Sequence, residues 1–175
     1  VECSARVNKN DDRTRGGGAI AAKNVNSLMV SNCTFSACDT LTTGGAVFAK
    51  IMDGTSMTVN NSIFRNDSCK GQGGGIGVYQ VTENAKTTAQ LTVNGCKFEN
   101  CSSGTQNGSG GAIQSYLPCM SLQNSEFADC WAGKEGGGIN NFFGANYTEQ
   151  WNGSFMTISG CEFTRCRAED RFQVD

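Results

Sequence analysis

The chain has 175 residues, a formal net charge of −2 and ten cysteines, but no histidine. This length suits one domain with its own hydrophobic core, and so many cysteines indicate an extracellular or cell-surface protein with disulfides. The lack of imidazole excludes Ser-His and Cys-His nucleophile pairs and histidine metal ligands, and we expect no cofactor and no metal site. Without a basic run or a long apolar stretch, we expect neither nucleic-acid binding nor membrane insertion.

A Gly-Gly-small-aliphatic tetrad occurs five times and divides the chain into repeats. The tetrads begin at Gly17, Gly44, Gly73, Gly110 and Gly136. The repeats span approximately 16–43, 44–72, 73–109, 110–135 and 136–166. Repeats of this length predict a solenoid, in which each repeat packs only against its neighbours. We treat residues 1–175 as a single domain and expect it to be a segment of a longer solenoid.

A second motif follows each tetrad and reads apolar-x-apolar-x-x-(Cys/Ser)-x-Phe. Its alternation of apolar residues predicts strands rather than helices. The motif ends in Phe35, Phe64, Phe98, Phe127 and Phe163, which we expect to form a structural ladder. Each motif is broken by an Asn or a Gly, the residues that most readily adopt a positive φ, at Asn32, Asn61, Gly95, Asn124 and Gly160. This pattern predicts an all-β fold, a parallel β-helix of about five coils with three strands per coil and a corner between the second and third strands.

The tetrad and the phenylalanine motif resemble the polymorphic outer membrane protein repeat, whose signatures are Gly-Gly-Ala-Ile and Phe-x-x-Asn. This repeat is found in chlamydial surface proteins and in large surface proteins of protists, and the resemblance covers roughly residues 16 to 166. It implies a right-handed, single-stranded parallel β-helix in an extracellular adhesin or surface protein. The chain departs from the motif at its last position, which holds Cys38, Asp67, Cys101, Cys130 and Cys166 instead of Asn. A secreted relative from a eukaryote such as a protist therefore fits better than an autotransporter.

Six cysteines occupy two fixed positions in the first, third and fifth repeats. Cys33, Cys96 and Cys161 lie two residues before the phenylalanine, and Cys38, Cys101 and Cys166 lie three residues after it. We expect the within-coil disulfides 33–38, 96–101 and 161–166, provided that the chain reverses after the phenylalanine. Pairing along the first position is excluded, because Ser62 and Ser125 intervene and the next cysteine is about 9.6 Å away. The sequence leaves the pairing of Cys3, Cys69, Cys119 and Cys130 open, and reduced, inward-facing cysteines are the alternative.

Seven Asn-x-Ser/Thr sequons offer sites for N-glycosylation. The variable loops hold the better acceptors, Asn107, Asn146 and Asn152, and further candidates are Asn60, Asn66 and Asn100. We expect Asn32 to be structural, because it lies at a tight corner. The long loop of the last repeat gathers Phe142, Phe143, Tyr147 and Trp151, which predicts either a contact surface for a partner or a sugar, or a cover over one flank.

No cluster of carboxylates recurs in the repeats, so we expect no catalytic residue and no enzyme. The predicted function is a non-catalytic extracellular structural module: a subunit of a surface coat or filament, or a cell-surface adhesin. Both ends of the chain fall within a coil, which predicts self-assembly or contact with neighbouring β-helix segments through coil ends and loops, with glycans as further partners. The alternative is a carbohydrate-binding or polysaccharide-degrading β-helix, and an enzyme of that kind needs two carboxylates converging on one groove.

Overall fold

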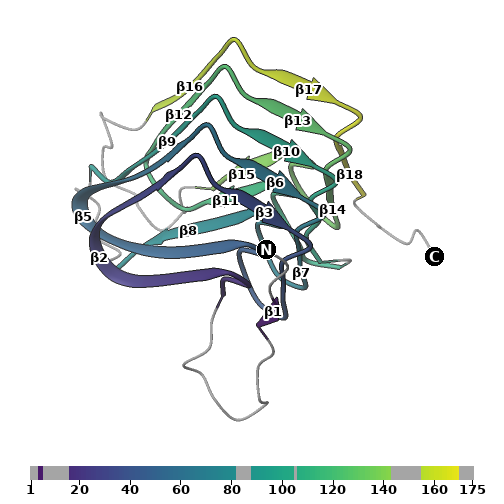
Figure 1. Ribbon diagram of the computed structural model, residues 1–175, viewed down its shortest axis with the longest axis horizontal. Coiled ribbons are helices and arrows are strands. Elements are labelled where there is room, and N and C mark those ends of the chain that lie inside the picture. The colour runs from purple at the N-terminus through teal and green to yellow at the C-terminus, as the bar shows by residue number, and fades with distance from the viewer. Residues whose placement is uncertain (1–3, 6–15, 82–87, 105, 143–154, 170–175) are drawn as a thin grey trace.

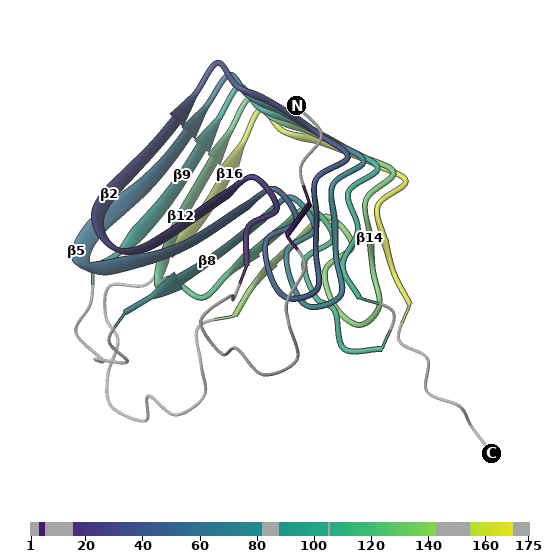
Figure 2. The same ribbon diagram turned by 60° about the horizontal axis from the view of Figure 1, so that its bottom comes forward.

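The computed structural model describes residues 4–5, 16–81, 88–104, 106–142 and 155–169. In this part of the chain all regular structure is β, and every pairing between strands is parallel. Strands of successive repeats lie side by side, so that the repeats stack upon one another (Figures 1 and 2). The predicted all-β, parallel character is thus confirmed.

The tetrad strands and the strands with alternating apolar residues share one curled sheet of eight strands. Its path runs β15-β11-β8-β5-β9-β12-β16, with β2 paired to β5. The two sets are joined because β2 and β5 are long enough to carry both segments of their repeats. The strands are β2 (Ile20–Ser31), β5 (Val47–Asn60), β8 (Ile76–Gln80), β9 (Gln90–Asn94), β11 (Ile113–Ser115), β12 (Cys119–Gln123), β15 (Ile139–Asn141) and β16 (Phe155–Ser159).

The phenylalanine segments form a second sheet of five strands. Its order is β17-β13-β10-β6-β3, and each phenylalanine is in register with the next. Neighbouring rings stack with centroids 4.6 to 4.9 Å apart, which confirms the predicted ladder. The strands are β3 (Thr34–Ser36), β6 (Ile63–Arg65), β10 (Lys97–Glu99), β13 (Glu126–Ala128) and β17 (Glu162–Thr164).

A set of two-residue strands follows the phenylalanine strands, where the sequence predicted only three strands per coil. These strands are β1 (Ser4–Ala5), β4 (Asp39–Thr40), β7 (Ser68–Cys69), β14 (Trp131–Ala132) and β18 (Arg167–Ala168). Ser102 makes single bridges to Ser68 and to Trp131, so the third repeat joins the same row. Segments of two residues are too short for a pattern of alternation to reveal.

Two left-handed corners flank each phenylalanine strand. The predicted corner is confirmed, since Asn32 and its four equivalents have φ between 46° and 63°. A second corner lies two residues after each phenylalanine, with φ between 49° and 57° at Ala37, Asn66, Asn100, Asp129 and Arg165. The sequence does not predict this corner, because alanine and arginine do not signal a positive φ.

The two glycines of the tetrad serve different purposes. The first, such as Gly44 with φ +68°, turns the chain into the next strand. The second lies against neighbouring backbone: a Cβ on Gly45 would lie 1.9 Å from the Gly74 carbonyl oxygen and 2.6 Å from that of Ser68. Any side chain here would force adjacent repeats apart, so this position admits only glycine.

Candidate functional site

The last repeat exposes apolar side chains whose equivalents in the fourth repeat are buried. Met156, Ile158 and Phe163 are 42%, 50% and 44% exposed, whereas Met120, Leu122 and Phe127, their in-register partners, are at most 1% exposed. Their strands β16 and β17 end their sheets, as the yellow outer edge in Figure 1 shows. At the opposite end, Val30 and Phe35 are only 3% and 7% exposed, although their strands also lie at sheet edges. The two ends of the stack therefore differ.

One vertical row of residues, here called the alternating column, consists of Cys33, Ser62, Cys96, Ser125 and Cys161. The Cys33 amide donates a hydrogen bond to Ser62 Oγ and the Cys96 amide donates one to Ser125 Oγ, both at 3.1 Å. Each serine hydroxyl donates in turn to a carbonyl within its own repeat, at 2.8 Å for Ser62 and 2.7 Å for Ser125. Burial raises the pKa of Cys96 above its ordinary value. The serines thus link the repeats through polar contacts and separate the cysteines, as the sequence predicts.

A second row, the contiguous column, holds the last position of each phenylalanine motif: Cys38, Asp67, Cys101, Cys130 and Cys166. Hydrogen bonds of 2.9 to 3.0 Å run from the amide that follows each member to the carbonyl of the member one repeat earlier. Cys101, Cys130 and Cys166 therefore lie on consecutive repeats. The Cys130 thiol donates to the carbonyls of Phe98 at 3.6 Å and Ala128 at 3.4 Å, and the neighbouring Cys101 thiol, together with burial, raises its pKa to about 12.

No disulfide joins any of the nine cysteines that the structure describes. The predicted pairs 33–38, 96–101 and 161–166 are wrong, because the chain does not reverse after the phenylalanine. In the first repeat β3 runs extended between two corners, and four extended steps from Cys33 to Ala37 cover about 13 Å. A disulfide needs Cα atoms within about 7 Å. Cys3 lies outside the described residues.

Asp67 is the only charged member of either column, and its side chain is fully buried. Its Oδ1 accepts a hydrogen bond of 2.9 Å from the Cys38 amide. Its Oδ2 is buried without a hydrogen-bond partner. Burial raises the pKa of this carboxyl from 3.8 to about 6, against the lowering effect of its hydrogen bonds. The carboxyl is therefore a titratable group in the mildly acidic range.

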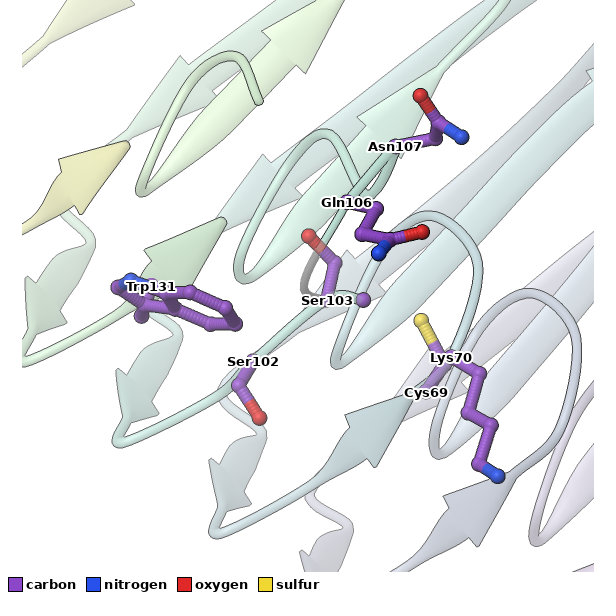
Figure 3. A pocket seen from close by; sticks show the side chains of 8 residues that line it. Cys69, Lys70, Ser102, Ser103, Gln106, Asn107 and Trp131 are labelled. Carbon is purple, nitrogen blue, oxygen red and sulfur yellow. The ribbon is translucent and has the colours of Figure 1, made fainter. Parts of the chain in front are cut away.

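A hollow of about 460 Å³ lies on the outside of the row of short strands (Figure 3). Trp131 stands on one side of it and Lys70 on the other, with the Gln106 amide between them and Asn107 beyond Gln106. Ser103 Oγ, also in its lining, is buried without a hydrogen-bond partner. An indole face, amides and a hydroxyl are groups that can bind a polar, ring-shaped ligand such as a sugar. The sequence does not predict this hollow, because the hollow depends on how the loop after Cys101 folds against the stack.

Carboxylates on the outer face form ion pairs with cations of adjacent positions. Glu99 pairs with Arg65 at 2.6 Å and with Lys97 at 2.9 Å, while both Asp129 oxygens accept from Arg165. These cations lower the pKa values of Glu99 and Asp129. In the described part of the chain, no group of three or more Cys, Asp or Glu side chains could hold a metal ion. Hydrolysis of a glycosidic bond needs one carboxyl group that stays protonated beside one that is ionised. These ion pairs instead favour the ionised form of both Glu99 and Asp129.

The sequons lie in different surroundings. Asn107 is exposed at the hollow, and Asn66 and Asn100 are exposed at the second corner, where Asn100 Nδ2 donates to Asn66 Oδ1 at 2.8 Å. Asn60 is half-buried in β5, and Asn32 occupies its predicted corner. The candidates Asn146 and Asn152 lie outside the described residues. Asn107 is therefore the described loop sequon with an open surface around it.

The predicted aromatic cluster of the last loop is only partly described. Phe142 is exposed and its ring meets that of Tyr116 edge-on at 5.9 Å. Phe143, Tyr147 and Trp151 lie outside the described residues. The structure adds Tyr79, which stacks on Tyr116 at 4.5 Å, and both hydroxyls donate to Gln72 Oε1. The cluster thus continues a row of aromatic residues down the outside of the stack.

The described part of the chain contains no helix that could cross a membrane. Comparison of the chain with protein-family models, with curated proteins and with solved structures finds no match.

Proposed function

We propose that the chain is a non-catalytic structural module of an extracellular, right-handed, single-stranded parallel β-helix. In this proposal its last repeat stacks against a further β-helical repeat in a surface coat, a filament or an adhesin. The exposure of Met156, Ile158 and Phe163, at positions that are buried one repeat earlier, is the observation that carries the proposal. In a solenoid such positions become buried when another repeat is added.

The chemistry of this end favours another β-helical repeat as the occupant. Among the residues that the structure describes, the edge strands β16 and β17 each have a sheet neighbour on one side only. An exposed strand edge presents unpaired amides and carbonyls, which an incoming strand satisfies. The same strand that supplies this pairing also places an apolar side chain over each exposed one, as every internal pair of repeats does. A sugar or a lipid would satisfy only one of these two requirements.

Self-association of the purified chain tests this proposal directly. We expect concentration-dependent association by multi-angle light scattering, and ordered head-to-tail or end-to-end assemblies by electron microscopy. Met156→Lys should raise the dissociation constant at least tenfold, since loss of a buried methionine side chain costs about 1.5 to 3 kcal/mol. The lysine stem can lie along the rim with its charge in water, so the fold should persist, as circular dichroism would confirm.

Met29→Lys tests the direction of the assembly, because Met29 is a 73% exposed methionine on β2 at the other end of the stack. This change should weaken association where the stack is head-to-tail, and should leave association unaltered where two last repeats meet. A chain that stays monomeric at millimolar concentration, or a Met156→Lys chain that associates as tightly as the unsubstituted chain, would refute the proposal. An extracellular route predicts in addition that Asn107 carries a glycan when the chain passes through a eukaryotic secretory pathway. The intact mass before and after glycosidase treatment, with Asn107→Gln as control, would measure this.

The hollow supports a second candidate function, binding of a carbohydrate. The unpartnered hydroxyl of Ser103 and the indole of Trp131 favour it. Titration of neutral oligosaccharides should change the fluorescence of Trp131 in a Trp151→Phe background, which leaves Trp131 as the single tryptophan of the chain. Ser103→Ala should weaken the response about tenfold, as expected for one lost hydrogen bond. A flat titration across a glycan panel would exclude this candidate.

A further inference from the structure

The contiguous column is the place in the described chain where cysteines lie on neighbouring repeats. Its neighbours Cys101, Cys130 and Cys166 are tied by backbone hydrogen bonds from Trp131 to Cys101 (2.9 Å) and from Arg167 to Cys130 (3.0 Å). Parallel strands lie about 4.8 Å apart, and a disulfide requires Cα atoms about 4.4 to 6.8 Å apart. The thiols of Cys130 and Cys166 each donate to a backbone carbonyl one repeat earlier, Phe98 at 3.6 Å and Phe127 at 3.3 Å, so both lie between adjacent repeats of the same column. Closing a bond between two of them needs side-chain rotation and a small approach of the two repeats, because in-register Cβ atoms about 4.8 Å apart must come within about 4.5 Å.

The other described cysteines have no cysteine on an adjacent repeat at the same position. In the alternating column the neighbours are Ser62 and Ser125. Cys69 is in register with Thr40, and Cys119 with Gln90 and Phe155. In the contiguous column Cys38 is next to Asp67. The register alone therefore selects one set of thiols from the described part of the chain.

This set allows two disulfides between adjacent repeats, 101–130 and 130–166, and the two pairs differ in exposure to solvent. Cys101 and Cys130 are fully buried, whereas Cys166 is partly exposed in the last repeat. The Cys166 thiol donates to the Phe127 carbonyl at 3.3 Å, which keeps it over the fourth repeat and next to Cys130. A small reagent can thus reach Cys166 first, and Cys130 is the thiol within reach of the product.

We propose that Cys166 and Cys130 form a disulfide between the fifth and fourth repeats by exchange with a low-molecular-weight disulfide. The Cys166 sulfur, after losing its proton, attacks one sulfur of the reagent, whose S–S bond breaks and whose other half leaves as a thiol. The Cys130 sulfur, also deprotonated, then attacks the Cys166 sulfur of this mixed disulfide and releases the second half as a thiol. Two protein thiols are oxidised and one small disulfide is reduced to two thiols. Cys101 stays reduced.

Such a bond would fasten the repeat with the open edge to the body of the stack. The fifth repeat contacts the described chain on one side only and its apolar side chains are exposed, so it is prone to local unfolding. A link between Cys130 and Cys166 removes conformational freedom from the unfolded segment between them. The bond therefore stabilises the last repeat, whose strands β16 and β17 form the edge that the proposed assembly uses. Formation of the bond depends only on the fold and not on that assembly.

Peptide mapping of the folded chain tests the proposal. The chain is incubated with oxidised glutathione at pH 8, quenched with acid, alkylated and digested with trypsin without reduction. Trypsin leaves Cys101, Cys119 and Cys130 on the peptide 98–134, Cys161 on 135–165 and Cys166 on the dipeptide 166–167. We expect 98–134 linked to 166–167, fragmentation that places the link at Cys130, and an unfolding midpoint several degrees higher.

Three other products would overturn the proposal: a link between 135–165 and 166–167, an internal link within 98–134, or a lasting glutathione adduct on Cys166. Cys130→Ser should abolish the linked product and leave Cys166 as the mixed disulfide. Cys96→Ser is the matched control from the alternating column and should leave the link intact. The wild-type mapping decides the question even where a variant fails to fold.

Discussion

The two cysteine columns run side by side through the same stack, yet they place their thiols in opposite situations. In the alternating column every cysteine has serine neighbours, whose hydroxyls accept amide hydrogen bonds from the adjacent repeat. In the contiguous column thiols meet thiols at Cys101, Cys130 and Cys166, and a buried carboxyl stands next to Cys38. Whether a cysteine in these repeats can form a disulfide depends on its neighbours on adjacent repeats rather than on its neighbours in sequence. Four experiments would break or sharpen this difference.

The largest expected effect is on the reactivity of Cys130. The neighbouring Cys101 thiol and burial raise the pKa of Cys130 to about 12, so at pH 8 to 9 its thiolate fraction is about a thousandfold below that of an ordinary thiol. Alkylation of the folded, reduced chain should therefore modify Cys130 about a thousandfold more slowly than a free cysteine peptide. Timed labelling with light and heavy iodoacetamide would measure it. Cys161, which is partly exposed in the alternating column, is the internal reference, and equal rates at the two sites would contradict the prediction.

The next effect is a pH dependence of stability that arises from Asp67. Its pKa is about 6 in the folded chain against 3.8 for an ordinary carboxyl, so the folded state holds the proton more tightly than the unfolded state. The stability from this group is fully present below pH 4 and is lost as the pH rises through 6. The loss is about 3 kcal/mol. Urea unfolding at pH 4 and pH 7.5 would measure it.

Asp67→Asn keeps an oxygen for the Cys38 amide but carries no charge, so it should remove this component of the pH dependence and stabilise the chain at pH 7.5. Other carboxylates contribute equally to both chains and cancel in the difference. If the difference in free energy of unfolding between the Asp67→Asn chain and the unsubstituted chain is the same at both pH values, the carboxyl is hydrated rather than buried.

A smaller effect is expected when the alternating column is made contiguous. Ser125→Cys places three cysteines on consecutive repeats and replaces the acceptor of the Cys96 amide with a weaker one, which costs about 1 kcal/mol in the reduced chain. With oxidised glutathione the variant should gain a new link from residue 125 to Cys96 or to Cys161, detected by peptide mapping. Ser125→Ala is the control with the same loss of a hydroxyl and no new thiol. If Ser125→Cys forms no link, register alone is insufficient for bonding.

Much of this stack can be predicted from the sequence, because the repeated positions are defined by side-chain volume and by backbone conformation. Phe98 and its equivalents recur at a fixed place and form the observed ladder, and Asn61 and Gly95 mark a corner that requires a positive φ. The second corner was missed because two of its five members, Ala37 and Arg165, avoid that conformation elsewhere. The strand it begins has only two residues, below the length at which alternation is visible.

The candidate site was harder to predict. The contiguous column was present in the sequence, since Cys101, Cys130 and Cys166 each lie three residues after a phenylalanine. Pairing within a repeat was nevertheless predicted, on the condition of a chain reversal that the extended strands do not make. The hollow beside Trp131 depends on the packing of a loop of irregular length, for which no repeated pattern exists. The apolar side chains of the phenylalanine motif are more exposed in the last repeat than in the first. This difference depends on which side chains pack over them, and composition does not contain that information.

The smallest expected effect concerns the ion pair beside the contiguous column. Arg165 donates to both oxygens of Asp129, with distances of 2.6 and 2.7 Å, across the second corners of the fourth and fifth repeats. Both side chains are largely exposed, and exposed ion pairs contribute little because water and salt screen them. Asp129→Asn preserves a residue that tolerates the positive φ of this corner, as Asn66 and Asn100 do in other repeats. We therefore expect no measurable change in the thermal unfolding midpoint and none in its dependence on salt. A fall of several degrees would mean that the charge pair, rather than the shape of the corner, holds Cys130 and Cys166 in register.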